Sequence, residues 1–127
     1  MTVFDELYNR ALNLAYFFLK FRPRTRKEVL NYLEKKSKKY HFSDDIISNS
    51  IKHLIEVNLI NDKDFVSWFV EQRNLNKPKS KFALSQELIR FGIEKGLIEE
   101  YFNRNELDEL KLAKTALQKK SYLIKNL

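Results

Sequence analysis

The chain has 127 residues, of which 43% are hydrophobic and 13% aromatic, and it contains two Gly, two Pro and no Cys. This apolar content argues against disorder, the few Gly and Pro disfavour an all-β fold with its many turns, and the lack of Cys excludes disulfides and thiolate metal sites. The net charge of +7 suggests an anionic partner such as nucleic acid, an acidic protein surface or anionic lipid, with basicity that serves no specific partner as the alternative.

The sequence shows no sign of a membrane segment. It contains no charge-free apolar run near the roughly 18 residues that a bilayer-spanning helix needs. Its first residues include Asp5 and Glu6 and lack the basic region followed by an apolar core that marks a signal peptide. We therefore expect a cytoplasmic protein that does not bind membranes.

An amphipathic helix is predicted over residues 2–21, because apolar side chains recur there at steps of three and four. Tyr16 and Phe17 widen its apolar face, so we expect this helix to pack on two sides. Pro23 disfavours the α conformation at Arg22, and the helix should therefore end there.

Two shorter helices are predicted next. Thr25 and Glu28 have the spacing of a capping box, in which each side chain accepts the other residue's backbone N–H, and this predicts a helix from Thr25 to Lys38. Ser43 is the expected N-cap of a third helix, which should end near Asn58, a residue type that tolerates the left-handed conformation. The residues expected to face inward from the third helix are Ile47, Ile51, Leu54 and Ile55.

A second set of helices is predicted after residue 60. Asp62 is the expected N-cap of the first, the polar stretch 74–80 indicates a loop, and Gly92 should end the helix after that loop. Asn105 and Asp108 have the spacing of another capping box. The ranges expected for the helices after the loop are 81–91, 94–102 and 105–120. The residues expected to face inward from the 81–91 helix are Phe82, Leu84, Leu88 and Ile89.

The order of one long and two short helices occurs twice. A shift of 55 residues places Thr25 on Ser80 and Leu33 on Leu88, and a repeat of roughly 45–55 residues is typical of stacked helical units. We therefore predict an all-α fold of tandem three-helix repeats, elongated and curved, with two complete repeats and one terminal helix. The expected units are residues 1–60, 61–103 and 104–127, the last being the start of a third repeat or a cap.

No catalytic or metal-binding constellation stands out. His41 and His53 are twelve residues apart and would not share a helix face, so no metal site is expected. The acidic pairs at 44–45 and 99–100 are adjacent, and adjacent helical residues point about 100° apart, so neither forms a natural carboxylate dyad. With two Gly in the chain, there is no glycine-rich phosphate loop. We expect neither enzyme activity nor a cofactor.

Positive charge is concentrated at two corners between helices. The segment from Lys20 to Lys39 carries nine Lys or Arg and two Glu, which gives +7 and equals the net charge of the chain. Arg can bind phosphate or carboxylate through two parallel hydrogen bonds, and a helix N-terminus adds its dipole. A solvated run of charge is the alternative. The residues that we predict to contact a partner or DNA are Arg22, Arg24, Arg26 and Lys27 at the first basic corner and Arg73, Lys77, Lys79 and Lys81 at the second basic corner.

Aromatic residues give a weaker indication. Four aromatic residues could stack on the bases of a nucleic acid: Phe17, Phe18, Trp68 and Phe69. They lie at helical spacing within apolar faces, which favours packing in the core, with Trp68 as the candidate for partial exposure.

Taken together, these residues resemble the RecX family, bacterial modulators of the recombinase RecA. The family patterns are R-x-R-[S/T]-x-x-E-[L/V]-x-x-x-L, D-D-x-x-[F/Y]-A-x-x-[W/Y]-x-x-x-R and E-L-x-x-K-G-[I/V]. The segments that match them, in the same order, are 22–33, 61–73 and 87–93, and the resemblance covers roughly residues 8–115. Asn61, Ser80 and Phe91 depart from the pattern, because they stand where Asp, Gly and Lys are usual.

The resemblance implies a curved string of three-helix repeats that lies in the groove of a RecA–DNA filament and modulates, usually inhibits, ATP hydrolysis and strand exchange in recombination and DNA repair. It predicts a monomeric, non-enzymatic regulator whose basic residues contact acidic RecA surface or the phosphates of single- or double-stranded DNA, while Thr25 and Glu28 hold the corner in shape. The third repeat is only begun, which implies a weaker grip or a fragment. A free-standing helical DNA-binding module or transcriptional regulator is the alternative, and a helical scaffold for another acidic protein is a third.

Overall fold

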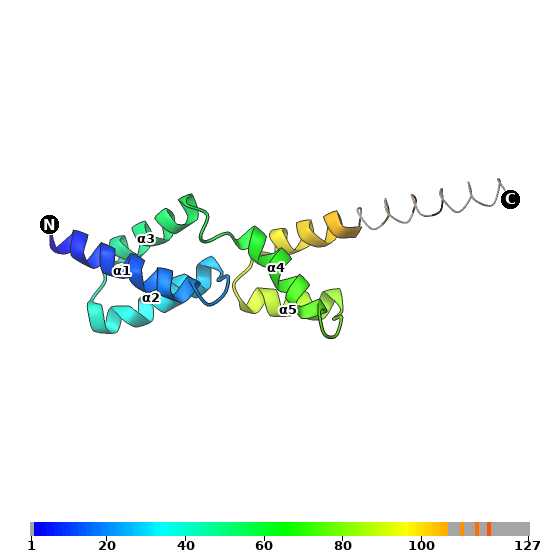
Figure 1. The fold of residues 1–127 in the computed structure, drawn as a ribbon, viewed down its shortest axis with the longest axis horizontal. Helices are drawn as coiled ribbons and strands as arrows, with labels where there is room; N and C mark the ends of the chain where they lie inside the picture. Colours follow the sequence, from blue (N-terminus) through cyan, green and yellow to red (C-terminus); the bar gives the residue numbers. More distant parts are fainter. Residues whose placement is uncertain (1, 107–109, 111–113, 115–116, 118–127) are drawn as a thin grey trace.

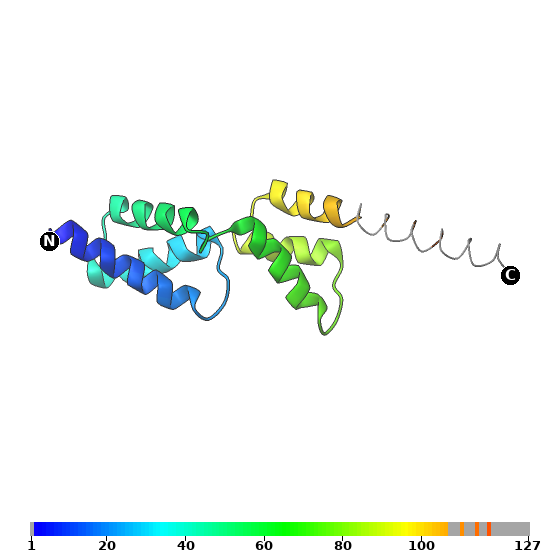
Figure 2. The same cartoon turned by 45° about the horizontal axis from the view of Figure 1, so that its top comes forward.

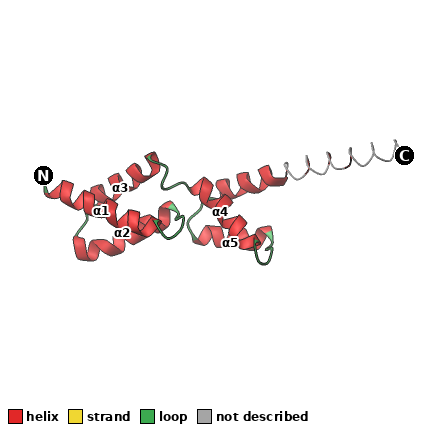
Figure 3. Ribbon diagram, in the orientation of Figure 1, coloured by secondary structure: helices red, strands yellow, loops and turns green. Residues whose placement is uncertain are grey.

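The computed structural model describes residues 2–106, 110, 114 and 117. These residues form helices and contain no strand (Figure 3), so the all-α prediction is confirmed. The helices are α1 (Val3–Leu19), α2 (Arg26–Tyr40), α3 (Asp44–Glu56), α4 (Asp62–Asn74), α5 (Lys81–Arg90) and a segment that begins at residue 95 and continues through 106.

Two groups of helices follow one another along the long axis of the molecule. Figures 1 and 2 show α1, α2 and α3 at one end and α4, α5 and the 95–106 helix beyond them. Each group has its own buried core, and no residue belongs to both. This is the elongated tandem of three-helix units that the sequence predicts. Among the described residues, no helix combines the length and apolarity required to cross a bilayer.

The first core lies where α1 packs against α2 and α3. Ala11 and Ala15 are fully buried, and their small side chains let the other helices approach closely. Phe18 of α1 stacks on Tyr32 of α2, with ring centroids 4.2 Å apart. The other buried apolar residues are Leu12, Val29, Leu33, Phe42, Ile46, Ile47, Ile51, Leu54 and Ile60.

The second core is built around aromatic rings. Phe65 of α4 is 1% exposed, and its ring centroid lies 5.9 Å from that of Phe69 and 5.6 Å from that of Phe91. Because Phe91 follows α5, its ring connects α4 to the turn after α5. The other buried members are Val66, Val70, Leu84, Leu88, Ile93 and Ile98.

Polar caps set the helix starts. In each labelled helix, the cap side chain accepts the backbone N–H three positions further on, and these caps are Thr2, Thr25, Ser43, Asn61 and Ser80. The capping box of Thr25 and the cap of Ser43 are therefore confirmed. The predicted cap at Asp62 is wrong by one residue. The Asn61 side-chain oxygen accepts from Asp64 N at 3.0 Å, and Asp62 is the first helical residue.

Left-handed backbone conformations end two helices where the sequence predicts an end. Asn58 has φ +62° after α3, and Gly92 has φ +88° after α5. His41, the C-cap of α2, has φ +57°, which the sequence analysis did not predict. The 95–106 helix includes Asn105, so the predicted end at 102 and the new cap at 105 are wrong. Apart from 110, 114 and 117, the rest of the predicted 105–120 helix lies outside the described residues.

Five apolar side chains assigned to helix faces are exposed instead. Tyr16 is 39% exposed, Phe17 59%, Ile55 44%, Phe82 74% and Ile89 37%. Phe17 lies two positions after the buried Ala15, and Phe82 lies two positions before the buried Leu84. Side chains two positions apart in a helix point about 200° apart, so these two rings face away from the core. Ile55 lies at the edge of the face that carries the buried residues of α3. Helical spacing alone does not identify which edge of a face a neighbouring helix covers.

Candidate interaction site at the repeat junction

The two repeats meet at a repeat junction, formed by residues 22–28, Asp62 and the turn Phe91–Gly92. Its centre is Thr25, which is fully buried. The Thr25 hydroxyl accepts from Glu28 N at 3.1 Å and donates to the Phe91 carbonyl oxygen at 2.6 Å. The Glu28 carboxylate in turn accepts from Thr25 N at 3.1 Å. The capping box of α2 thus also contributes a hydrogen bond to the second repeat.

Glu28 pairs with two arginines of the first basic corner. Arg22 reaches it through both terminal nitrogens, at 3.2 and 2.5 Å, and an Arg24 nitrogen lies 3.8 Å away. The Arg24 guanidinium also lies 4.1 Å from the ring centroid of Phe18, and its side chain is 16% exposed. Burial lowers the pKa of Arg24 from its ordinary value, and the charge of Arg22 lowers it further, while Glu28 opposes both. One carboxylate therefore compensates two cations.

Asp62 connects the N-termini of two helices. It is the first residue of α4, and its Oδ1 accepts from Arg26 N, the first N–H of α2, at 2.8 Å. The N–H groups of a first helical turn have no partner within the helix, so this carboxylate satisfies one of them. Burial raises the pKa of Asp62, while the hydrogen bond from Arg26 N opposes the rise.

Gly92 permits the close approach of the two repeats. A Cβ built on Gly92 would lie 2.5 Å from Lys27 Cβ, closer than two such atoms can approach. The Lys27 stem therefore covers the glycine, while the residue as a whole remains exposed. On the other side of the turn, the Arg22 guanidinium lies 5.5 Å from the ring centroid of Phe91.

The second basic corner repeats the charge pattern of the first. Glu87 of α5 accepts from Lys79 at 2.8 Å and forms an ion pair with Arg73 at 3.0 Å. The hydrogen bond from Lys79 holds the pKa of Glu87 below its ordinary value, and Arg73 adds to this effect, while burial opposes it. The Arg73 guanidinium also lies 5.3 Å from the ring centroid of Phe69. Two cations again share one carboxylate.

A junction groove runs beside these contacts and consists of two adjoining hollows. One has a volume of about 390 Å³ and lies between the end of α1 and the start of α4; the other, of about 290 Å³, lies between α4 and the turn after α5. Arg22 and Trp68 line both hollows. Trp68 is only partly buried, which agrees with the exposure predicted for it.

The predicted contact residues divide into those with an ion pair and those without one. Arg22, Arg24 and Arg73 line the groove and are held by carboxylates. Lys79 pairs with Glu87 at 2.8 Å, and Lys81 lies 3.7 Å from Glu106. Three of the eight have side chains without an ion pair among the described residues: Arg26, Lys27 and Lys77.

The sequence analysis missed several partners at this site. It did not assign Glu87, Asp62 or the Phe91 carbonyl as the groups to which the basic corners and Thr25 bind. Glu87 could have been predicted, because clustered cations repel one another unless a carboxylate lies nearby, and Glu28 is the carboxylate that does this in the first repeat. The Phe91 carbonyl gives no signal, because a backbone oxygen is present at every residue.

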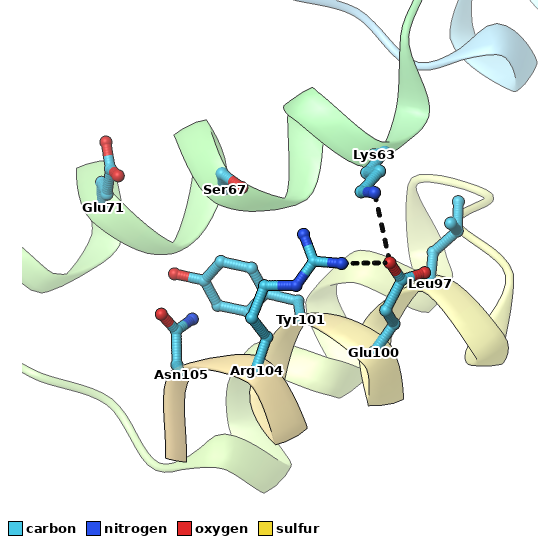
Figure 4. Close-up of a pocket in the computed structure, with 8 residues that line it drawn as sticks. All are labelled: Lys63, Ser67, Glu71, Leu97, Glu100, Tyr101, Arg104 and Asn105. Carbon is cyan, nitrogen blue, oxygen red and sulfur yellow. Dashed lines mark hydrogen bonds and ion pairs between the residues drawn. The ribbon is translucent and has the colours of Figure 1, made fainter. Parts of the chain in front are cut away.

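A separate pocket lies within the second repeat (Figure 4). It has a volume of about 190 Å³ between α4 and the 95–106 helix. Lys63 and Arg104 both point to Glu100, at 3.2 and 3.0 Å, whereas Glu71 points away from them. Among the described residues, no group of three or more His, Asp or Glu side chains is placed to hold a metal ion.

Comparison with protein-family models finds no match. A regulatory protein RecX of Streptococcus pneumoniae serotype 19F (strain G54) is 36% identical over 103 residues, which are 81% of this chain and 38% of that relative. One from Streptococcus uberis (strain ATCC BAA-854 / 0140J) is 35% identical over 112 residues, 88% of this chain and 41% of the relative. The crystal structure of RecX from Lactobacillus salivarius has a TM-score of 0.60 and 32% identity, covering 77% of this chain and 58% of that chain. The chain spans about two fifths of the length of the curated relatives it matches.

Proposed function

Because the chain belongs to the RecX family, we propose that it is a non-enzymatic regulator that binds the RecA–DNA filament in the cytoplasm and inhibits RecA. The observation that supports this proposal is the uncompensated charge at the two basic corners. The Arg22–Arg24–Glu28 and Arg73–Lys79–Glu87 clusters each contain two cations and one carboxylate, so each retains a positive charge for an anionic partner. The protein acts as a monomer.

Five of the eight predicted contact residues fall into two roles in this proposal. The partly buried Arg22 and Arg24 keep the junction in shape and contribute the residual charge. Arg26, Lys27 and Lys77 are exposed, so their charged ends contact acidic surface of RecA or DNA phosphate. Contacts of this kind guide association and set its dependence on salt.

ATP hydrolysis by RecA on single-stranded DNA tests the proposal. We expect the chain to lower the rate when it is present at well below one molecule per RecA subunit, because a regulator that caps or destabilises a filament affects many subunits. An unchanged rate at equimolar chain, with the chain folded by circular dichroism, would contradict the proposal.

Direct binding to DNA without RecA is the second candidate function. The exposed cations Arg26, Lys27 and Lys77 favour it, since they could neutralise phosphates. In that case log K for duplex DNA should fall with log salt by about 0.9 for each phosphate contact. A gel shift across a salt series, with RecA absent, distinguishes this candidate from filament binding, which requires RecA at every salt concentration.

A further inference from the structure

We propose that the junction groove binds a short acidic peptide segment of a protein partner, with an apolar side chain against Trp68 and carboxylates beside the arginines. The inference rests on the proposed function only in taking the regulated protein as the source of that segment. It assigns a binding site and a ligand chemistry to a surface that the contacts among the described residues leave open.

The charge of the groove favours carboxylates. Lys20, Arg22 and Arg24 line the larger hollow and Arg73 lines the smaller one, against a single acidic residue, Asp64. Glu28 and Glu87, which lie outside the lining, compensate only part of this charge, since each is shared by two cations. Positive charge in a partly desolvated groove attracts anionic groups more strongly than the same charge on an open surface.

The apolar part of the groove is centred on Trp68. Its neighbours Phe65 and Phe69 are 1% and 5% exposed, whereas Trp68 is only partly buried and contributes to both hollows. Leu59 lines the larger hollow and is 47% exposed. Trp and Arg are the residue types that contribute most of the binding energy in protein interfaces. Volumes of about 390 and 290 Å³ suit a few side chains of a peptide.

The rings of the groove are arranged for a peptide rather than for a nucleic acid strand. Single strands bind by stacking successive bases on several open rings. Here Arg22 lies over Phe91 and Arg73 over Phe69, so guanidinium groups already cover these two rings and Trp68 remains. A peptide with one apolar residue flanked by acidic residues needs one accessible ring, which Trp68 provides, and positive charge on both sides of that ring.

Trp68 is the single Trp of the chain, so its fluorescence reports on the groove directly. The probe is the blocked peptide Glu-Asp-Phe-Asp-Glu, titrated into the full chain. We expect a saturable change in emission. The peptide with Gln and Asn in place of its acids, and the peptide with Ala in place of Phe, should each bind about tenfold more weakly. A saturable change that is equally strong with the amide peptide would overturn the role of charge.

Two variants at exposed leucines complete the test. Leu59→Glu puts a negative charge, which repels the acidic peptide, into the groove. Leu75→Glu changes a leucine that is 74% exposed and does not line the groove. We expect Leu59→Glu to weaken peptide binding about tenfold and Leu75→Glu to leave it unchanged, with both variants helical by circular dichroism. Equal affinities of the two variants, no saturable change, or tighter binding of a short oligothymidylate than of the peptide would overturn the inference.

The RecA assay separates this inference from the proposed function. Inhibition of RecA by a chain that fails to bind the acidic peptide would overturn the inference alone. Peptide binding by a chain that has no effect on RecA would support the inference and contradict the proposed function.

Discussion

Thr25 and Phe91 are 66 positions apart in the sequence, yet the Thr25 hydroxyl donates to the Phe91 carbonyl oxygen at 2.6 Å. The same hydroxyl accepts the backbone N–H of Glu28 at 3.1 Å, so both of its hydrogen-bonding functions are used at a fully buried position. Buried polar groups are costly when they lack a partner. One oxygen atom therefore takes part both in the cap of α2 and in a contact with the second repeat.

Replacing Thr25 by Val should destabilise the protein. Val keeps the shape but removes the cap and leaves the Phe91 carbonyl without its donor, and we expect a loss of about 2–4 kcal/mol in the free energy of unfolding. Urea denaturation followed by circular dichroism measures it. Thr25→Ser keeps the hydroxyl and serves as the control, with a loss of under about 1.5 kcal/mol for one methyl group. Equal losses for Val and Ser would show that the hydroxyl contributes nothing.

The two glycines should respond to alanine in opposite directions. Gly92 has φ +88° and no room for a Cβ beside Lys27, so Gly92→Ala should cost more than about 1–2 kcal/mol. Gly96 lies in the 95–106 helix, and a Cβ there would meet nothing within 4 Å. Gly96→Ala should therefore stabilise the protein by up to about 1 kcal/mol. Urea midpoints of the two variants provide the comparison, and a shift in the same direction would refute it.

Glu87 should make stability depend on pH. Its pKa in the folded protein is lowered from 4.5, chiefly by the hydrogen bond from Lys79. A carboxyl whose folded pKa is depressed contributes stability above its unfolded pKa and loses it as the pH falls through the folded value. Glu87→Gln should thus be less stable than the parent near pH 7, and the difference should shrink below pH 4.5. A difference independent of pH would mean that the ion pairs of Glu87 do not stabilise the fold.

Asp62 should have the opposite dependence. Burial raises its pKa from 3.8, so the folded state holds the proton more tightly than the unfolded chain does, and the contribution of Asp62 to stability falls as the pH rises from 3.8 through the folded value. Asp62→Asn keeps an oxygen for Arg26 N and does not titrate. Relative to the parent, this variant should become more stable as the pH rises through that window. Unfolding measured at intervals of about one pH unit between about pH 3 and pH 7 would show a falling difference in stability if the sign is wrong.

Local signals predicted the fold better than the contacts between repeats. The capping box of Thr25 and Glu28 and the left-handed Asn58 involve neighbours within a few residues, so the sequence contains the whole interaction. The bond from Arg26 N to Asp62 joins segments 36 positions apart and depends on how the repeats stack. The exposure of Phe82 has the same origin, because helical spacing defines an apolar face but does not say which helix covers it.

The exposed cations provide the sharpest test of function. Arg24 packs on Phe18 and pairs with Glu28, so reversing its charge would disturb the repeat junction itself. Arg26→Glu combined with Lys77→Glu changes exposed side chains, and an acidic residue at the start of α2 suits the helix dipole. We expect the double variant to keep its helicity and to bind the RecA filament with a loss of about 2 kcal/mol, or roughly thirtyfold.

The matched control reverses two other exposed lysines, Lys52→Glu with Lys114→Glu, and changes the net charge by the same amount. Filament binding can be followed by co-sedimentation with RecA on single-stranded DNA. If only the total charge mattered, both double variants would lose the same affinity. A loss confined to Arg26 and Lys77 would instead locate the contact at the two basic corners, and unchanged binding of both variants would contradict the proposed role of these corners.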